Sequence, residues 1–263
     1  GFLLTISFQV SHLIFALDRQ FVSSLFDINT YAVYAFAYNL ISIITSIISA
    51  LSLVLFPRLK QKNKDQILYT YENTLVYISI FALGAVLLFL PMSMVISKFL
   101  NNYVFSINYL KIIFPGLALN CCISIVIFTY YKSLELIKPF FKISCLVLLI
   151  AIVTNTIAYI NFKSPQSISI ASIVTMILWY CICCIDFNKR FNIKWYKNFS
   201  YIILLMSFYY LISFILDNDL LIFIIYGILY MIITFAFYKA QLVSLKKILF
   251  KTIKKDRVVI NND

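Results

Sequence analysis

Charged side chains are scarce in this sequence, and glycine is rarer still. Of its 263 residues only 12% are charged and 63% are hydrophobic, with four glycines and one histidine. Soluble domains are about 25% charged and about half apolar. One membrane crossing takes about 20 consecutive apolar residues in a helix. The composition therefore excludes a soluble protein and indicates a chain whose length is filled by membrane helices.

Patterns that carry catalysis or hold cofactors are lacking as well. One histidine cannot build a histidine-based metal site, no two carboxylates share a helix face, and four glycines leave no phosphate-binding loop. All six cysteines lie inside apolar runs without zinc-site spacing, so we interpret them as small buried apolar residues. Alternating segments of about ten residues, typical of membrane β-barrels, do not occur. The sequence predicts an all-α integral membrane protein that is not an enzyme and uses no cofactor.

Apolar runs predict about eight transmembrane helices. They cover residues 1–17, 30–56, 74–96, 107–131, 139–160, 168–185, 199–216 and 220–238. Pro57 is expected to end the second helix, Pro91 to lie near the end of the third, and Pro139 to fit the first turn of the fifth. Pro115 followed by Gly116 predicts a kink within the fourth.

Basic residues are distributed unevenly between the two sides of these helices. Eighteen of the 22 lysines and arginines follow the second, fourth, sixth and eighth helices, and four fall on the other side. Because cytoplasmic loops carry the excess of Lys and Arg, the N-terminal side of the first helix and the C-terminus are expected in the cytoplasm. The net charge of +12 is explained by these loops, so nucleic acid is not an expected partner.

The last segment, residues 239–263, has a character of its own. Apolar residues recur there at helical spacing, and lysines occupy the other faces. This pattern predicts a basic amphipathic helix on the cytoplasmic leaflet. Its expected role is to anchor the last membrane helix, with a regulatory or partner-binding role as the alternative.

A few polar residues fall at membrane depth, where they are costly to bury and are usually functional. Asp18 and Arg19 lie near the outer end of the first helix and point about 100° apart. They are either an interfacial anchor or a charge pair lining a cavity. His12, about 9 Å below Asp18, is expected either to hydrogen-bond a neighbouring helix or to line a lumen and couple to protons.

The second helix carries a stripe of small polar residues, spaced three or four apart: Asn39, Ser42, Thr45, Ser46, Ser49 and Ser52. Such a stripe indicates either close helix packing or a hydrated groove. Asn120 and Ser124 add polar groups to the fourth helix. Lys142, one turn into the fifth, is expected to snorkel to the cytoplasmic surface or to meet an anionic headgroup.

Two sets of candidate site residues follow. The candidates for substrate binding are Arg19, Asp18, Lys142, Ser46 and Asn120. The candidates for ion coupling are His12 and Asp18. No metal ligands are expected.

Three short stretches together resemble a known family. Leu17-Asp18-Arg19 precedes the aromatic entry Tyr31-Ala32-Val33-Tyr34-Ala35, and the second helix leaves through Leu55-Phe56-Pro57-Arg58-Leu59. In order and spacing they resemble the polysaccharide-biosynthesis flippases, the Wzx-type O-antigen (O-unit) flippases. These belong to the multidrug/oligosaccharidyl-lipid/polysaccharide exporter superfamily. The match covers mainly residues 15–64, and the rest of the chain agrees in helix count and topology.

This resemblance implies a domain arrangement and a function. Residues 1–185 would form the second six-helix transporter lobe, 186–238 two additional membrane helices and 239–263 the cytoplasmic tail. The chain begins without Met inside an apolar run, so the N-terminal lobe of the same protein is expected to be missing from it. The implied function is transport of a lipopolysaccharide or polysaccharide repeat unit, an undecaprenyl-pyrophosphate-linked oligosaccharide, across the bacterial inner membrane by alternating access.

The resemblance also implies partners and leaves rivals open. Membrane lipids and the pyrophosphate-linked substrate would be the partners, with Arg19, and less surely Lys142, attracting the pyrophosphate. A drug antiporter of the same superfamily is the first alternative, although it would be expected to keep carboxylates buried within its helices. A membrane enzyme such as an O-unit polymerase is the second, and a nonfunctional remnant the third.

Overall fold

The computed structural model describes residues 2–61, 63–216 and 218–260, with the side chains of 51–58, 60 and 244–260 left out. Within this part of the chain, eight helical spans are long and apolar enough to cross a membrane. They are Phe2–Leu25, Ile28–Ala50, Lys64–Phe99, Ser106–Ser133, Ile137–Phe162, Pro165–Phe191, Tyr196–Ile215 and Asp219–Val243. The chain is an all-α membrane protein with about eight spans, as its composition predicted.

Some of these spans are single helices and others are built from several pieces. The single helices are α1 (Phe2–Leu25), α2 (Ile28–Lys60), α8 (Ile137–Phe162), α9 (Pro165–Phe191), α10 (Tyr196–Ile215) and α11 (Asp219–Ile260). The third span joins α3 (Lys64–Ala85), the 3₁₀ turn η1 (Val86–Leu88) and α4 (Phe89–Phe99), and η2 (Asn101–Tyr103) follows it. The fourth joins α5 (Ser106–Ile113), η3 (Phe114–Gly116), α6 (Leu117–Cys121), the π-helical η4 (Cys122–Ile127) and α7 (Phe128–Ser133).

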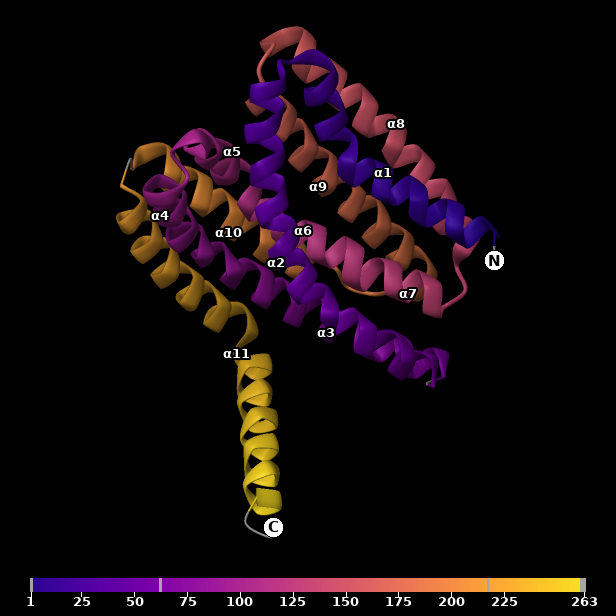
Figure 1. The fold of residues 1–263 in the computed structure, drawn as a ribbon. Helices are drawn as coiled ribbons and strands as arrows, with labels where there is room; N and C mark the ends of the chain where they lie inside the picture. Colours follow the sequence, from indigo (N-terminus) through magenta and orange to yellow (C-terminus); the bar gives the residue numbers. More distant parts are fainter. Residues whose placement is uncertain (1, 62, 217, 261–263) are drawn as a thin grey trace.

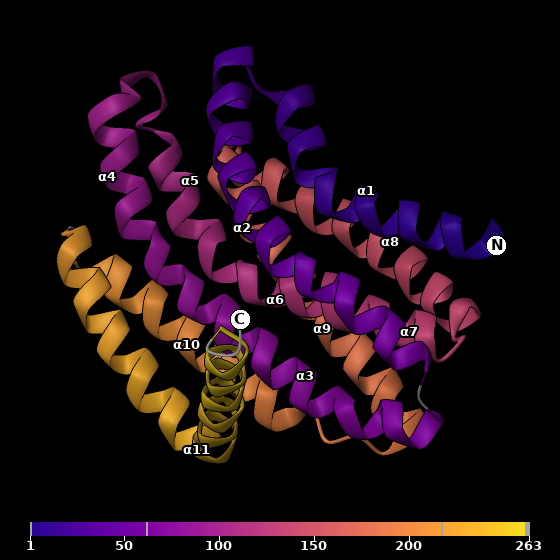
Figure 2. The same cartoon turned by 60° about the horizontal axis from the view of Figure 1, so that its bottom comes forward.

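The helices pack as two flanks around the broken fourth span (Figures 1 and 2). On one flank α1 lies on α8 and α8 on α9; on the other α10 and α11 pack together and against α3, with α11 also touching α4. The fourth span is the most buried of the eight. The C-terminal ends of α1, α4, α8 and α10 lie at one end of the bundle, here the Asp27 end, and those of α2, α7 and α9 at the other.

Prolines explain where two spans break. Pro91 has no N–H to offer the carbonyl of Leu87, and the 3₁₀ turn η1 lies at this point. The kink predicted at Pro115 is confirmed, because η3 interrupts the helix there. The prediction that Pro57 ends the second helix is wrong, since α2 continues to Lys60. A proline near a helix end removes one backbone hydrogen bond but still permits the last turn to form.

The start of α2 is fixed by its capping residue. The Asp27 carboxylate accepts hydrogen bonds from the backbone N–H groups of Asn29 (3.1 Å) and Thr30 (3.0 Å). The hydroxyl of Thr30 donates a further bond of 2.6 Å, which holds the pKa of the Asp27 carboxyl below its usual value. This cap fixes the residue at which α2 begins.

Small hydroxyl residues bring α1, α8 and α9 close together. The Oγ atoms of Ser11 and Ser144 lie 3.2 Å apart between α1 and α8, and both residues are fully buried. Thr154 and Thr175 make the corresponding contact between α8 and α9 at 2.9 Å. Lipid tails are as apolar as leucine, so close packing and such hydrogen bonds, rather than exclusion from water, hold membrane helices together.

Candidate functional site

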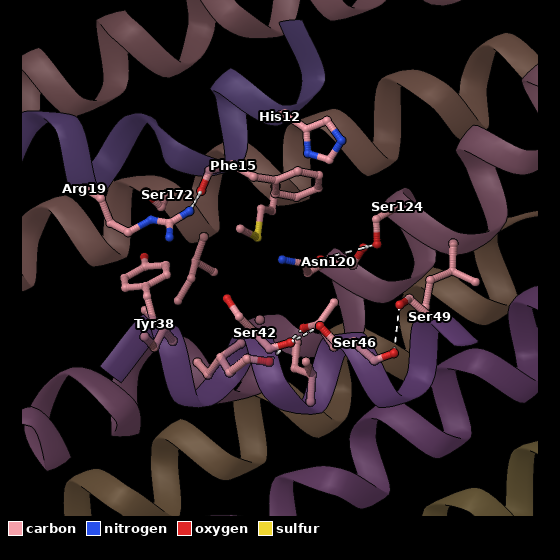
Figure 3. A pocket seen from close by; sticks show the side chains of 18 of the residues that line it. His12, Phe15, Arg19, Tyr38, Ser42, Ser46, Ser49, Asn120, Ser124 and Ser172 are labelled. Atoms are coloured by element: carbon pink, nitrogen blue, oxygen red, sulfur yellow. Dashed lines mark hydrogen bonds between the residues drawn. The ribbon is translucent and has the colours of Figure 1, made fainter. Parts of the chain in front are cut away.

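A cavity of about 430 Å³ lies at membrane depth between α1 and α2 (Figure 3). The broken fourth span closes it on one side and α9 on another. The aromatic part of its wall consists of Phe15, Tyr38 and Phe128. The polar lining consists of His12, Arg19, Ser42, Thr45, Ser46, Ser49, Asn120, Ser124 and Ser172. The cavity therefore combines two basic side chains with a ring of hydroxyl and amide groups.

The polar stripe of α2 forms one wall of this cavity. The hydroxyl of Ser46 donates to the carbonyl of Ser42 (2.7 Å), and that of Ser49 to the carbonyl of Ser46 (2.8 Å). With its hydrogen bonded to the helix itself, the Ser46 oxygen can still accept a hydrogen bond on the cavity surface. Four members of the stripe line the cavity, which favours the hydrated groove over close helix packing. The side chain of Ser52 lies outside the described residues.

Arg19 places a positive charge at the cavity, and two contacts orient the plane of its guanidinium group. Its guanidinium lies over the ring of Tyr38, 5.6 Å from the centroid, and one Nη donates to the carbonyl of Phe15 at 3.4 Å. Its Nε is buried and has no hydrogen-bond partner among the described residues. The two ion pairs of the described residues are Lys111–Asp219 and Arg190–Asp186, so the Arg19 guanidinium makes no direct ion pair with a carboxylate there.

Asp18 points away from the cavity although it is the neighbour of Arg19. It is only 2% exposed, and its Oδ2 accepts a 3.3 Å bond from the hydroxyl of Tyr34. The hydroxyl of Ser169 on α9 in turn donates to Tyr34 at 3.3 Å. Asp18 thus links α1, α2 and α9 and is not among the residues that line the cavity.

A second, much smaller cavity of about 10 Å³ adjoins Asp18. Asn155, Ser172 and Thr175 also line it, and Asn155 is 1% exposed. The amide nitrogen of Asn155 donates to Ala151 O (2.8 Å), but its Oδ1 has no partner among the described residues. This space is about the size of one water molecule, and its oxygen atoms are of the kind that hold a proton carrier or a small hard cation.

The remaining candidates separate into two groups. His12 lines the large cavity, and its imidazole makes no hydrogen bond to another residue of the described chain, so the interhelical bond is not observed. Asn120 also lines it, and its amide nitrogen points towards the middle of the space (Figure 3). Lys142 does not reach it: Lys142 is exposed on α8, nearly opposite Ser144, which faces α1. Lys142 is therefore not among the residues that line the cavity, and its snorkelling to the membrane surface stays a prediction.

Sequence reasoning missed the partners of Asp18. The sequence indicates Tyr34 only as part of an aromatic helix entry, yet its hydroxyl and that of Tyr38 lie 3.3 Å apart beside Asp18. Their spacing of four residues places both on one helix face, and this spacing is the sequence feature that could have predicted their contact. Asn155 is a second residue beside Asp18 that the sequence does not connect to α1, because no local pattern links the two helices.

The chain matches no protein-family model and no curated protein. Its function therefore has to be inferred from its own residues.

Proposed function

We propose that the chain is a lobe of a bacterial inner-membrane flippase for an oligosaccharide linked through pyrophosphate to a polyprenol. The observation that carries this proposal is the cavity itself, a polar space at membrane depth whose only described full charge is Arg19. The proposed topology places the Asp27 end outside and the C-terminus in the cytoplasm, following the distribution of basic residues.

The lining fits an anionic headgroup that carries sugars. Phosphate oxygens are the acceptors that a guanidinium fork binds best, and Arg19 has a buried Nε–H without a partner. The hydroxyls of α2 and the amide of Asn120 match sugar hydroxyls, while Phe15 and Tyr38 provide flat apolar surfaces for sugar rings. An unsolvated phosphate in hydrocarbon is prohibitively costly, so a cavity of this chemistry lowers the barrier to its crossing.

The same lining argues against the rival transporter. A drug antiporter was expected to keep carboxylates buried within its helices, and the buried Asp18 meets that expectation. A cationic substrate would also need a carboxylate facing it. Among the described lining residues there is none, and Asp18 is turned to the other side of α1. A polymerase would need nucleophilic or acid–base groups arranged for glycosyl transfer, and the lining offers one imidazole among serines.

A second lobe is part of the proposal. Gln9 and His12 on α1 and Asn39, Ser42 and Ser46 on α2 are all exposed at membrane depth. Polar side chains rarely face lipid and usually face another helix or a water-filled path. We infer that a further group of helices, the N-terminal lobe of the same protein, covers this face and encloses the cavity, and that rocking of the two lobes gives alternating access.

Asp18 is the proposed coupling group. It is buried beside the small cavity, within a network that ties α1 to α2 and α9. Binding of a proton or a small cation at Asp18 would change the charge at the contact between α1, α2 and α9. His12 faces the substrate cavity and is the second candidate for proton coupling.

The test is ligand binding by the chain in lipid nanodiscs. Undecaprenyl pyrophosphate is expected to bind, and undecaprenol, which lacks the phosphates, to bind at least tenfold more weakly. A cationic dye is expected not to compete. Equal affinity for the two polyprenols, or displacement by the dye, would refute the anionic headgroup. Transport is then measured with the complete protein and a fluorescent lipid-linked oligosaccharide; glycosidic bond formation without transport would identify an enzyme instead.

A further inference from the structure

The last helix is bent at a single buried residue. α11 contains one residue with non-helical angles, Tyr238 (φ −136°, ψ 32°). Before it the helix packs against α3, α4 and α10; after it the helix leaves the bundle (Figures 1 and 2). Tyr238 is 2% exposed, its ring meets that of Tyr201 edge-on at 5.0 Å, and the Lys197 Nζ lies 5.0 Å above it. The bend is therefore anchored in the protein interior.

Tyr238 is hydrogen-bonded to a buried side-chain amide that also makes hydrogen bonds to two other helices. Its hydroxyl donates to the Oδ1 of Asn198 on α10 at 3.1 Å. The Nδ2 of Asn198 donates to Ser79 Oγ on α3 (3.0 Å) and to Tyr180 OH on α9 (3.1 Å). Asn198 is 6% exposed, so each bond that it loses leaves a buried polar group unpaired. We call Tyr238, Asn198, Ser79 and Tyr180 the Asn198 cluster.

The Asn198 cluster reaches the wall of the large cavity. The Oγ of Ser79 lies 3.3 Å from the Sγ of Cys122, the first residue of the π-helical segment η4. Asn120 and Ser124, two residues before and after Cys122, line the cavity. π-helical segments interrupt the regular register and are frequent at functional sites. A shift of Ser79 would therefore move η4, the part of the cavity wall whose backbone hydrogen bonding departs from the regular α-helix.

Beyond the bend the sequence is strongly basic. Residues 239–260 contain seven lysines and arginines and one carboxylate, and the backbone stays helical to Ile260. At 1.5 Å per residue this helix is about 33 Å long. Basic juxtamembrane helices bind anionic lipid through their charge. The angle at Tyr238 decides whether this helix can lie along a membrane surface while the rest of α11 stays packed.

We propose that the helix 239–260 senses anionic lipid and that Tyr238 transmits its docking, through the Asn198 cluster, to the cavity wall at Asn120 and Ser124. When the basic helix is docked, the bend is held and the Asn198 cluster keeps η4 in place. When it is released, Tyr238 is free to move and the wall loosens. Anionic lipid is thereby a regulator of the cavity. The proposal rests on the proposed function only in taking this cavity as the transport site.

The test separates docking from transmission. The variant Ser124→Cys is placed in nanodiscs of neutral lipid or of lipid containing 40% phosphatidylglycerol. Docking is measured as amide hydrogen exchange of residues 239–260. The state of the wall is measured as the rate at which a water-soluble thiol reagent modifies Cys at position 124, quantified by peptide mass spectrometry to separate it from the native cysteines. Neither readout uses substrate, so failure of the flippase assignment leaves this test intact.

Three further changes are made in the Ser124→Cys background. Replacing Lys246, Lys247, Lys251, Lys254 and Lys255 by Gln removes most of the charge of the basic helix. Tyr238→Phe removes the hydroxyl that donates to Asn198. Tyr230→Phe is the matched control, because the Tyr230 hydroxyl on α11 donates to the Ile80 carbonyl (2.9 Å) and has no bond to Asn198.

In the parent, anionic lipid is expected to slow both exchange and thiol modification by at least threefold. The Gln variant is expected to lose both effects. Tyr238→Phe should keep the effect on exchange and lose that on modification, and Tyr230→Phe should behave as the parent. The proposal is overturned if anionic lipid protects 239–260 without altering modification, or if Tyr238→Phe and Tyr230→Phe are indistinguishable. Should Tyr238→Phe elute as aggregate, Ser79→Ala, which cuts the same path nearer the cavity, takes its place.

Discussion

Removing the guanidinium of Arg19 tests the chemistry of the cavity most directly. Its Nε has no partner and only one Nη is engaged, by a long bond of 3.4 Å to the Phe15 carbonyl. The Nη beside the Nε–H is the one bonded to Phe15, so a phosphate on this edge would bind the unpartnered Nε–H and replace that long bond, for two charge-assisted hydrogen bonds in all. Each contributes about 1.5 kcal/mol or more, and partial exposure of Arg19 reduces the sum, so the pair stabilises the complex by about 1.5–3 kcal/mol.

Arg19→Ala should accordingly weaken the binding of undecaprenyl pyrophosphate about 10- to 100-fold. Arg19→Lys keeps the charge but loses the planar fork, and we expect an affinity between those of wild type and Arg19→Ala. Dissociation constants are measured in nanodiscs at two ionic strengths, and the difference between wild type and Arg19→Ala should shrink as salt rises.

Lys98→Ala is the control for a general effect of positive charge. Lys98 lies near the same end of the bundle but over the ring of Phe99, outside the cavity. Its replacement should leave the affinity within twofold of wild type. The reasoning fails if folded Arg19→Ala binds as tightly as wild type, or if Lys98→Ala loses as much affinity as Arg19→Ala.

Three further changes address coupling and packing. Asp18→Asn should abolish the dependence of transport by the complete protein on the ion gradient while undecaprenyl pyrophosphate still binds, and loss of binding alone would contradict the coupling role. Ser144→Leu overfills the contact with Ser11 and should lower stability by about 1–3 kcal/mol in SDS-induced unfolding, whereas Ser144→Ala should cost about 0.6 kcal/mol. A Cβ at Gly84 would lie 3.0 Å from the Tyr230 hydroxyl, so Gly84→Leu should push α11 off α3 and speed amide exchange in residues 220–243; unchanged exchange would refute this contact.

Local patterns in the sequence predicted the parts of the fold that depend on neighbours along the chain. Apolar runs gave the eight spans because each helix must satisfy its own backbone in lipid. Pro115 predicted a break because a proline removes its own hydrogen bond wherever it lies. Asp18 and Arg19 were predicted to point about 100° apart, and the structure places Arg19 on the cavity lining and Asp18 behind it.

What depends on distant residues could not be predicted this way. The direction in which Lys142 points is set by the packing of Ser144 on α1, 133 residues from Ser11. The burial of Asp18 depends on Tyr34 and on Ser169, which lie on two other helices. The segment η4 contains no proline or glycine that would have indicated its π-helical hydrogen bonding from the sequence. For Lys142 and Asp18 the deciding contacts are with other helices, about which periodicity along one helix carries no information.

The arrangement of Asp18 and Arg19 gives the proposed coupling a mechanical basis. Both side chains leave α1 within one residue, so any rotation of α1 about its axis moves them together. The bond from Tyr34 to Asp18 resists such a rotation, and the stacking of Arg19 on Tyr38 resists it from the cavity side. An ion that competes for the Asp18 carboxylate would weaken the first restraint, and a phosphate that draws Arg19 off Tyr38 would weaken the second. Tyr34→Phe removes the first restraint, together with the Tyr34 bonds to Tyr38 and Ser169, and leaves the guanidinium of Arg19 on the Tyr38 ring. It should therefore make phosphate binding less sensitive to the ion; unchanged sensitivity would show that Asp18 and Arg19 act independently.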